Sequence, residues 1–225
     1  MKLMNYRGIH KFLFVVLLTS MLGFATIQVF HSTGDITVEA ASKSKKKTTK
    51  KRVAKKKAVE SPKTVHDAKS MVGLKHFKYN SPSEKKAYPN LIDHPNAWID
   101  VNIATQRMYI KDGNKKLYSM YSSTGAHDTT PRGTYYIQSE RGNYFYTEPL
   151  KLGAYYWVSY LNHGEYLFHT TPTDENGKYV KSIAKTLGRK PSSHGCIHLS
   201  VADCKWVYEN VPYGMKVVIH GKYNS

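Results

Sequence analysis

The segment Ser193-His194-Gly195-Cys196 places a thiol among residues that can activate it for attack on an acyl group. A free cysteine has a pKa of about 8.5, so it is a good nucleophile at neutral pH only where a cation or a helix amino end stabilises its thiolate. Gly195 lets the backbone pass close to a substrate, and the amides of Gly195 and Cys196 are candidate donors to an oxyanion. The sequence therefore predicts Cys196 as a catalytic nucleophile.

A base for this thiol must come from elsewhere in the fold, because a histidine two residues away is poorly placed to bend back to it. His169 is the best candidate, since it ends the apolar run Tyr166-Leu167-Phe168, where a predicted strand opens into a loop. An ordinary imidazole pKa near 6.5 suits a group that takes a thiol proton and returns it to a leaving amine. We therefore predict His169 as the general base.

A helix is predicted directly after the cysteine segment. Ser200 and Asp203 have the spacing of a capping box, in which the Ser200 hydroxyl accepts the Asp203 amide and the Asp203 carboxylate bonds back. The helix should run to about Asn210, and its amino end would add a positive dipole near the thiol. Cys204 lies on this helix, and we interpret it as a small core residue.

The cysteine count argues against a disulfide framework and against a structural metal. Only Cys196 and Cys204 occur, eight residues apart in one local segment. His194 and His198 flank a single cysteine on what looks like a loop, which is not the spacing of a zinc site. We expect no metal and no cofactor.

The fold class follows from short alternating runs that begin near Trp98 and are separated by Gly, Pro or Asn turns. The predicted strands, which start as a β-meander, cover residues 99–103, 108–110, 117–120, 134–137, 155–160, 166–168 and 217–219. A second short helix is predicted at 181–187. This pattern is typical of a mainly β domain, a sandwich or barrel with one or two short helices.

The first sixty residues differ in composition from the rest. An uncharged stretch at 12–30 follows three basic residues and predicts a signal peptide or membrane anchor over 1–40, with the remainder outside the cell. Residues 41–60 are rich in lysine, and 61–96 form a lead-in segment before a catalytic domain at 97–222. The protein is therefore expected to be secreted or anchored at the cell surface.

The formal charge of +18 comes mainly from the lysine-rich segment, where residues 43–57 hold ten basic residues and no acidic one. Such a run cannot bury a core, so it predicts a disordered tether. It would contact anionic wall polymers or a membrane surface, or serve only as a solubilising spacer. No aromatic residues stand beside the lysines to stack on bases, so nucleic acid is not an expected partner.

Eighteen tyrosines are present, and many of them fall between 135 and 166. They would line a groove for a glycan or a peptide, or they occupy the half-buried faces on which strands place aromatic residues in any case. The second interpretation is favoured for any single tyrosine, so the sequence names none of them as a site residue.

The spacing of these motifs resembles one family, the L,D-transpeptidases of the YkuD type, over about residues 98–221. The matching segments are Phe168-His169-Thr170, Ser193-His194-Gly195-Cys196, Ser123-Thr124-Gly125 and Thr130-Pro131-Arg132-Gly133. The resemblance implies that Cys196 attacks the L,D peptide bond of a peptidoglycan tetrapeptide stem and expels D-alanine. An amine of a second stem then resolves the thioester as a 3-3 cross-link. It also implies acylation by carbapenems.

The resemblance assigns further roles to residues around the nucleophile. His169 would be the base, oriented by the carbonyl of Thr170 or Thr171, and His194 would position the substrate together with Ser193 and the Gly195 backbone.

Two features depart from the family pattern. His198 stands where arginine is usual, so a contact to a stem carboxylate would depend on pH. Residues 174–178 read as an inserted turn, either a lid or a plain surface loop.

Three alternative functions compete with this interpretation. Water in place of the acceptor amine would make the protein an L,D-carboxypeptidase. A domain that kept the fold without the chemistry would be a wall-binding module, which the intact His169 and Cys196 argue against. A papain-like peptidase would carry its cysteine early in the domain with the histidine downstream, the reverse of the order here.

Overall fold

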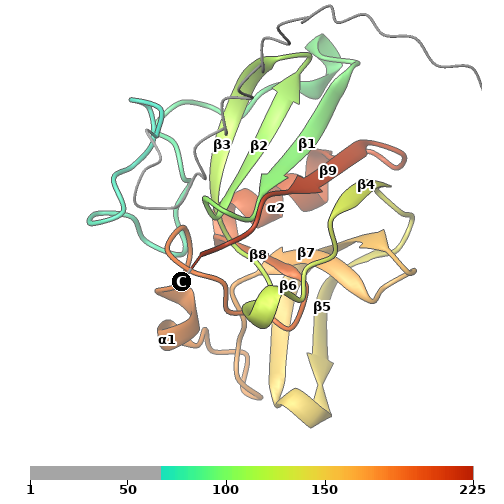
Figure 1. Ribbon diagram of the computed structural model, residues 1–225. Helices are drawn as coiled ribbons and strands as arrows, with labels where there is room; N and C mark the ends of the chain where they lie inside the picture. The colour runs from blue at the N-terminus through green and yellow to red at the C-terminus, as the bar shows by residue number, and fades with distance from the viewer. Residues whose placement is uncertain (1–66, 225) are drawn as a thin grey trace, which may run out of the picture. The chain divides into compact units, whose positions relative to one another are not determined.

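One nine-stranded sheet, in the order β4-β9-β1-β2-β3-β8-β7-β6-β5, organises the part of the chain that the computed structural model describes, residues 67–224 (Figure 1). The predicted signal or anchor and the lysine-rich tether lie outside the described residues. The strands are β1 (Ala97–Asn102), β2 (Arg107–Asp112), β3 (Lys115–Ser123), β4 (Gly133–Tyr136), β5 (Arg141–Thr147), β6 (Leu152–Leu161), β7 (Tyr166–Thr170), β8 (Ile197–Leu199) and β9 (Lys216–His220). The helices are α1 (Lys181–Ala184) and α2 (Val201–Asn210), with short 3-10 turns at Leu91–Asp93, Ala126–Asp128 and Glu148–Leu150.

The sheet has two halves that meet at β3. The body of β3 pairs with β2, and its last two residues, Ser122 and Ser123, pair with β8. The pairs β1 with β9 and β7 with β8 are parallel, and the others are antiparallel. The predicted meander covers β1, β2 and β3, and β5, β6 and β7 form a second antiparallel meander, which β8 joins to β3.

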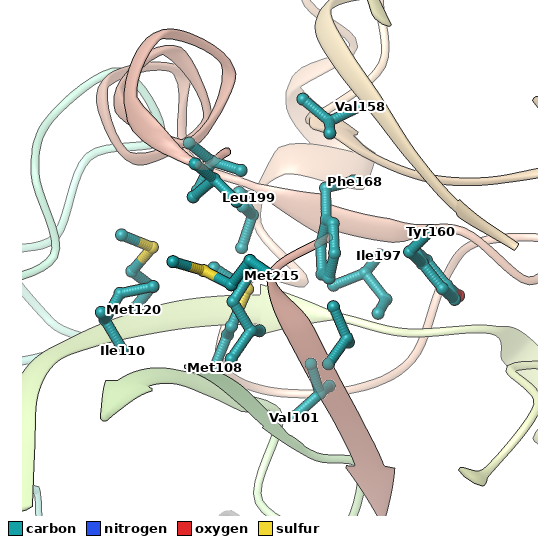
Figure 2. Packing of buried hydrophobic residues seen from close by; sticks show 14 of the residues in the cluster. Val101, Met108, Ile110, Met120, Val158, Tyr160, Phe168, Ile197, Leu199 and Met215 are labelled. Carbon is teal, nitrogen blue, oxygen red and sulfur yellow. The ribbon is translucent and has the colours of Figure 1, made fainter. Parts of the chain in front are cut away.

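The two halves share one hydrophobic core. Side chains that alternate along β1 and β2 point inward, among them Val101, Met108 and Ile110. They meet residues of the second half, including Phe168 and Ile197, and Figure 2 shows these groups in one cluster. The prediction of a mainly β, sandwich-like domain with few helices is thus confirmed.

Two strands were not predicted, and one of them carries site residues. Residues Ile197–Leu199 were expected in a loop, but they form β8, held between β3 and β7. Three residues are too few to show an alternating pattern, so only their distant partners define this strand. β5 was missed because exposed and half-buried residues follow one another along it without alternation.

Helix α2 begins as predicted, with the Ser200 hydroxyl accepting the Asp203 amide at 3.1 Å. The prediction that the Asp203 carboxylate bonds back to the start of the helix is wrong. The Asp203 carboxylate instead accepts from the Ser83 hydroxyl at 2.5 Å and from the Tyr88 hydroxyl at 2.8 Å. Helix α1 is also shorter than expected and ends at Ala184.

The lead-in segment is bound to the sheet at several points. The Asp67 carboxylate forms a salt bridge with the buried Arg107 of β2 at 2.8 Å. The Glu84 carboxylate accepts the amide of Ser119 on β3 at 2.6 Å. With the Asp203 contacts these bonds fix residues 67–96 against the domain. Within 67–224, no helix has the length and apolar character needed to cross a membrane.

Candidate active site

The loop that carries Cys196 is anchored to the end of β3. The amides of Ser192 and Ser193 donate to the Thr124 carbonyl at 2.8 and 3.0 Å, and the Ala126 amide donates to the Ser193 carbonyl at 2.8 Å. Gly125 is required in this contact, because a Cβ there would lie 2.2 Å from the Thr129 hydroxyl. The Ser-Thr-Gly motif thus has a structural role, which is to hold the cysteine loop.

A second set of hydrogen bonds fixes the backbone immediately before the thiol. The Thr130 hydroxyl accepts the Gly125 amide at 2.7 Å and donates to the Gly195 carbonyl at 2.8 Å. The buried Ser193 hydroxyl accepts the Gly195 amide at 3.1 Å and donates to the Cys196 carbonyl at 2.5 Å. The Gly195 amide is therefore occupied, and the Cys196 amide is the stronger candidate for an oxyanion donor.

Gly195 meets a strict steric requirement. Its φ of 149° is one that residues with a side chain rarely adopt, and a Cβ would lie 2.9 Å from the Tyr166 ring. Any other residue would push the loop away from β7 and displace the neighbouring Cys196.

The thiol of Cys196 is half-buried, and its sulfur lies 3.6 Å from the Glu165 carbonyl oxygen. Burial raises the pKa of this thiol to about 11. The free protein consequently holds Cys196 as a neutral thiol at pH 7, so the thiolate must form during reaction.

His169 is buried on β7, in register with His198 on β8. Its Nδ1 lies 2.8 Å from the Thr170 carbonyl oxygen. Because a carbonyl only accepts, we assign the ring proton to Nδ1, which makes Nε2 the basic nitrogen. Burial lowers the pKa of His169 to about 4, so the ring is neutral at pH 7.

Cys196 and His169 line the same cavity, of about 450 Å³, together with Ser193, His194, Gly195 and His198. His194 is exposed at this cavity, and the Thr170 side chain lies outside the lining. Within the described residues, no hydrogen bond joins the thiol to the His169 ring. The free protein thus presents a neutral thiol and a neutral imidazole to one space without an ion pair between them.

His198, expected to contact a stem carboxylate in a pH-dependent way, lies in a buried position on β8. Its ring centroid lies 4.8 Å from that of His169, and its Nδ1 has no hydrogen-bond partner among the described residues. Burial and the neighbouring imidazoles lower its pKa well below the usual value. Any contact to a stem carboxylate would begin from an uncharged ring.

One wall of the cavity was not found from the sequence. It is apolar and comes mainly from the β5–β6 hairpin and α1: Phe145, Tyr146, Leu150, Leu152, Trp157 and Ile183. The ring of Phe145 meets His169 edge-on at 5.3 Å, which helps to keep water from the imidazole. The aromatic residues at 144–146 could have indicated this wall. Because β5 was not predicted, however, nothing in the sequence placed them beside the cavity.

The inserted turn at 174–178 does not line this cavity. The Asp174 carboxylate accepts the amides of Asn176 and Lys178, both at 2.9 Å, so the turn is closed by its own hydrogen bonds. Among residues 67–224, no group of three or more His, Cys, Asp or Glu side chains is arranged to hold a metal ion.

Sequence comparison defines the class of protein to which this site belongs. The sequence model of the YkuD family, the L,D-transpeptidase catalytic domain, matches residues 96–219. The chain therefore belongs to the YkuD family of L,D-transpeptidase catalytic domains, as the motifs indicated.

One curated relative agrees with this assignment. The chain is similar to the "Putative L,D-transpeptidase YciB" of Bacillus subtilis (strain 168), with 48% identity over 136 residues, 59% of this chain and 69% of that protein. Among solved structures, an L,D-transpeptidase from Mycobacterium smegmatis matches with 19% identity and a TM-score of 0.46, over 56% of this chain and 59% of that one.

A fused Zn-dependent amidase/peptidase/peptidoglycan-binding domain-containing protein from Clostridium acetobutylicum matches with 28% identity and a TM-score of 0.43. That match covers 56% of this chain and 52% of that chain. The chain thus spans between half and three-fifths of these two solved structures.

Proposed function

We propose that the protein is a peptidoglycan L,D-transpeptidase in which Cys196 is the nucleophile and His169 the general base. The observation that carries the proposal is their placement in one cavity, on a loop and a strand that are each fixed by hydrogen bonds. Membership of the L,D-transpeptidase family supports peptidoglycan cross-linking as the activity of the domain.

In the first half-reaction the Cys196 sulfur forms a bond to the carbonyl carbon of the L,D peptide bond. The thiol proton moves to Nε2 of His169 and then to the leaving nitrogen, so that D-alanine departs as a neutral amine. The amide of Cys196 supports the oxyanion. In the second half-reaction an amine of another stem attacks the thioester, loses its proton to His169, and returns the thiol to Cys196.

The electrostatics of the free site favour proton transfer during attack rather than before it. Burial raises the pKa of the thiol and lowers that of the imidazole, so a preformed ion pair is disfavoured. A substrate carbonyl at the sulfur changes this balance, because negative charge then passes to an oxygen that amides can stabilise. The apolar wall of the cavity strengthens those interactions by excluding water.

Substrate contacts are assigned to the remaining residues of the cavity. His194, exposed at this cavity, would position the donor stem, while Ser193 keeps the loop in shape. His198 would meet a carboxylate of the stem as a neutral donor, and more strongly once protonated.

We also propose that the enzyme works outside the cell, secreted or anchored by its first forty residues. The lysine-rich tether would then hold it near anionic wall polymers or the membrane surface by Coulomb attraction.

The test is incubation of the purified protein with a tetrapeptide stem, followed by mass spectrometry of the products. The proposal expects dimers that have lost one D-alanine, and none with Cys196→Ala. Tripeptide without dimer would identify an L,D-carboxypeptidase, and unchanged stems with a folded protein would identify a binding module. Either result overturns the transpeptidase assignment.

A further inference from the structure

A second hollow, of about 550 Å³, lies between β4, the end of β6 and the turn before β9. We call it the tyrosine hollow. Residues that line it include Tyr135, Tyr136, Gln138, Tyr160, His163 and Tyr213. None of the proposed catalytic groups belongs to it, so it is distinct from the cysteine cavity.

The walls of the tyrosine hollow are fixed by hydrogen bonds between segments distant in the chain. The Gly214 amide donates to the Ile137 carbonyl at 2.8 Å, which ties the turn before β9 to the end of β4. The Gln138 side-chain oxygen accepts the Ser159 hydroxyl at 2.8 Å and the His163 amide at 2.9 Å. The hollow is therefore present before any ligand binds.

Two of its tyrosines present aromatic faces to solvent. Tyr136 is 57% exposed and Tyr213 is 75% exposed. Neither takes part in a ring contact or a side-chain hydrogen bond with the described residues. Both rings are therefore available to pack against a ligand in the hollow.

Tyr160 is an enclosed part of the lining. It is only 1% exposed, and its hydroxyl, which is closed to solvent, has no hydrogen-bond partner among the described residues. A ligand would therefore make its contacts with the exposed Tyr136 and Tyr213 rather than with this hydroxyl.

The charge of the hollow narrows the class of ligand. Within residues 67–224 its lining contains no Lys, Arg, Asp or Glu, and the His163 ring lies 2.8 Å from the Glu140 carboxylate outside it. A polyanion or a peptide with free carboxylates would find no counter-charge there. A sugar fits better, because its C–H face packs on aromatic rings while its hydroxyls bond to amides and phenols.

We propose that the tyrosine hollow binds a neutral oligosaccharide, the glycan strand that carries the stem peptides. The identity of the glycan rests on the proposed function, whereas the preference for a saccharide rests on the hollow itself. The ring of Tyr160 lies 6.4 Å from that of Tyr166, which lines the cysteine cavity. A glycan strand in the hollow would thus hold its stem peptide near the cysteine cavity, with the Tyr160–Tyr166 pair between the two sites.

The test is calorimetric titration of the full chain, as Cys196→Ala, with the tetramer of N-acetylglucosamine. Saturable binding is expected, and Tyr136→Ala and Tyr213→Ala should each weaken it about three- to tenfold. Tyr144→Ala, an exposed tyrosine outside the hollow, is the matched control and should bind like its parent.

Absence of binding, or equal binding by all these variants, overturns the proposal. Displacement of the tetramer by a free tetrapeptide stem also overturns it, because the hollow would then be a peptide site.

A separate measurement distinguishes failure of the proposed transpeptidase function from failure of the oligosaccharide site. Tyr136→Ala should leave dimer formation from free stems unchanged and reduce it only for stems on glycan. If free stems never form dimers while Tyr213→Ala still loses oligosaccharide binding, the transpeptidase assignment alone falls.

Discussion

The two cysteines lie eight residues apart in the chain and in opposite surroundings. Cys196 is on a hydrogen-bonded loop and its sulfur faces a cavity, whereas Cys204 is on α2, inside the core, with its sulfur 3.2 Å from the Tyr156 carbonyl oxygen. Burial raises the pKa of both thiols in the free protein. Access to the cavity that His169 also lines therefore distinguishes Cys196, the proposed nucleophile, from Cys204, and a low pKa at rest does not.

The largest expected effect comes from replacing Cys196, and Cys204 is replaced for comparison. Cys196→Ala should lower dimer formation at least a thousandfold, about 4 kcal/mol, with an unchanged Tm, because no other sulfur of residues 67–224 lines the cavity. Cys204→Ala should keep the rate and lower the free energy of unfolding by about 1–2 kcal/mol through a small core cavity. Rates and urea unfolding of both variants provide the measurement. A rate loss of equal size in Cys204→Ala would contradict the assignment.

Removal of the proposed base should have the second-largest effect. His169→Gln should reduce the rate of acylation about a hundred- to a thousandfold, since the imidazole proposed to accept the thiol proton is then missing. Stopped-flow acylation of wild type and variant gives the ratio. His76→Gln, outside the cavity, is the control, and a variant rate within a factor of two of wild type would remove His169 from the mechanism.

The pH dependence of stability follows from the lowered pKa of His169. Between pH 6.5 and about 4 the unfolded chain holds a proton that the folded one lacks, so this contribution is complete above pH 6.5 and falls as the pH falls. His169→Gln should therefore flatten the stability curve by about 1.5–2 kcal/mol between pH 6.5 and 5. Urea unfolding at these two pH values measures it.

The exposed His194 supplies the comparison for that experiment, because His194→Gln keeps the buried His169 and should change the slope less than His169→Gln does. The buried Asp203, whose pKa burial raises to about 6, acts with the opposite sign but is present in all three proteins and cancels. An unchanged slope in His169→Gln would show that the ring is not held neutral by burial.

The smallest expected effect concerns the hydrogen bonds that hold the loop of Cys196. Thr130→Val removes the hydroxyl that joins the Gly125 amide to the Gly195 carbonyl, so the loop should shift and acylation should slow about tenfold. Thr129→Val is the matched control, because its hydroxyl bonds only to the Ala126 carbonyl within the same turn. Equal rates for the two variants would mean that the anchor does not position Cys196.

Much of the fold could be predicted from local sequence patterns. Alternation located seven of the nine strands, and the Ser200 cap located the start of α2. What the sequence did not reveal depends on contacts between distant residues. β8 exists only between β3 and β7, and the Asp203 carboxylate is taken by Ser83, 120 positions earlier.

The candidate site shows the same division. Residue types and motif spacing indicated Cys196 and His169, and the structure brings both to one cavity. The burial that makes His198 a neutral partner of His169, and the aromatic wall from Phe145 to Trp157, were not predictable, because both depend on β8 and β5, the two strands that local patterns missed.

Covalent labelling with a carbapenem, followed by peptide mapping, tests the central claim that Cys196 alone is the accessible acyl acceptor. Wild type and Cys204→Ala should each gain one adduct, mapped to Cys196, and Cys196→Ala should gain none while remaining folded. An adduct on Cys204, or a folded wild-type protein that stays unlabelled, would contradict the claim.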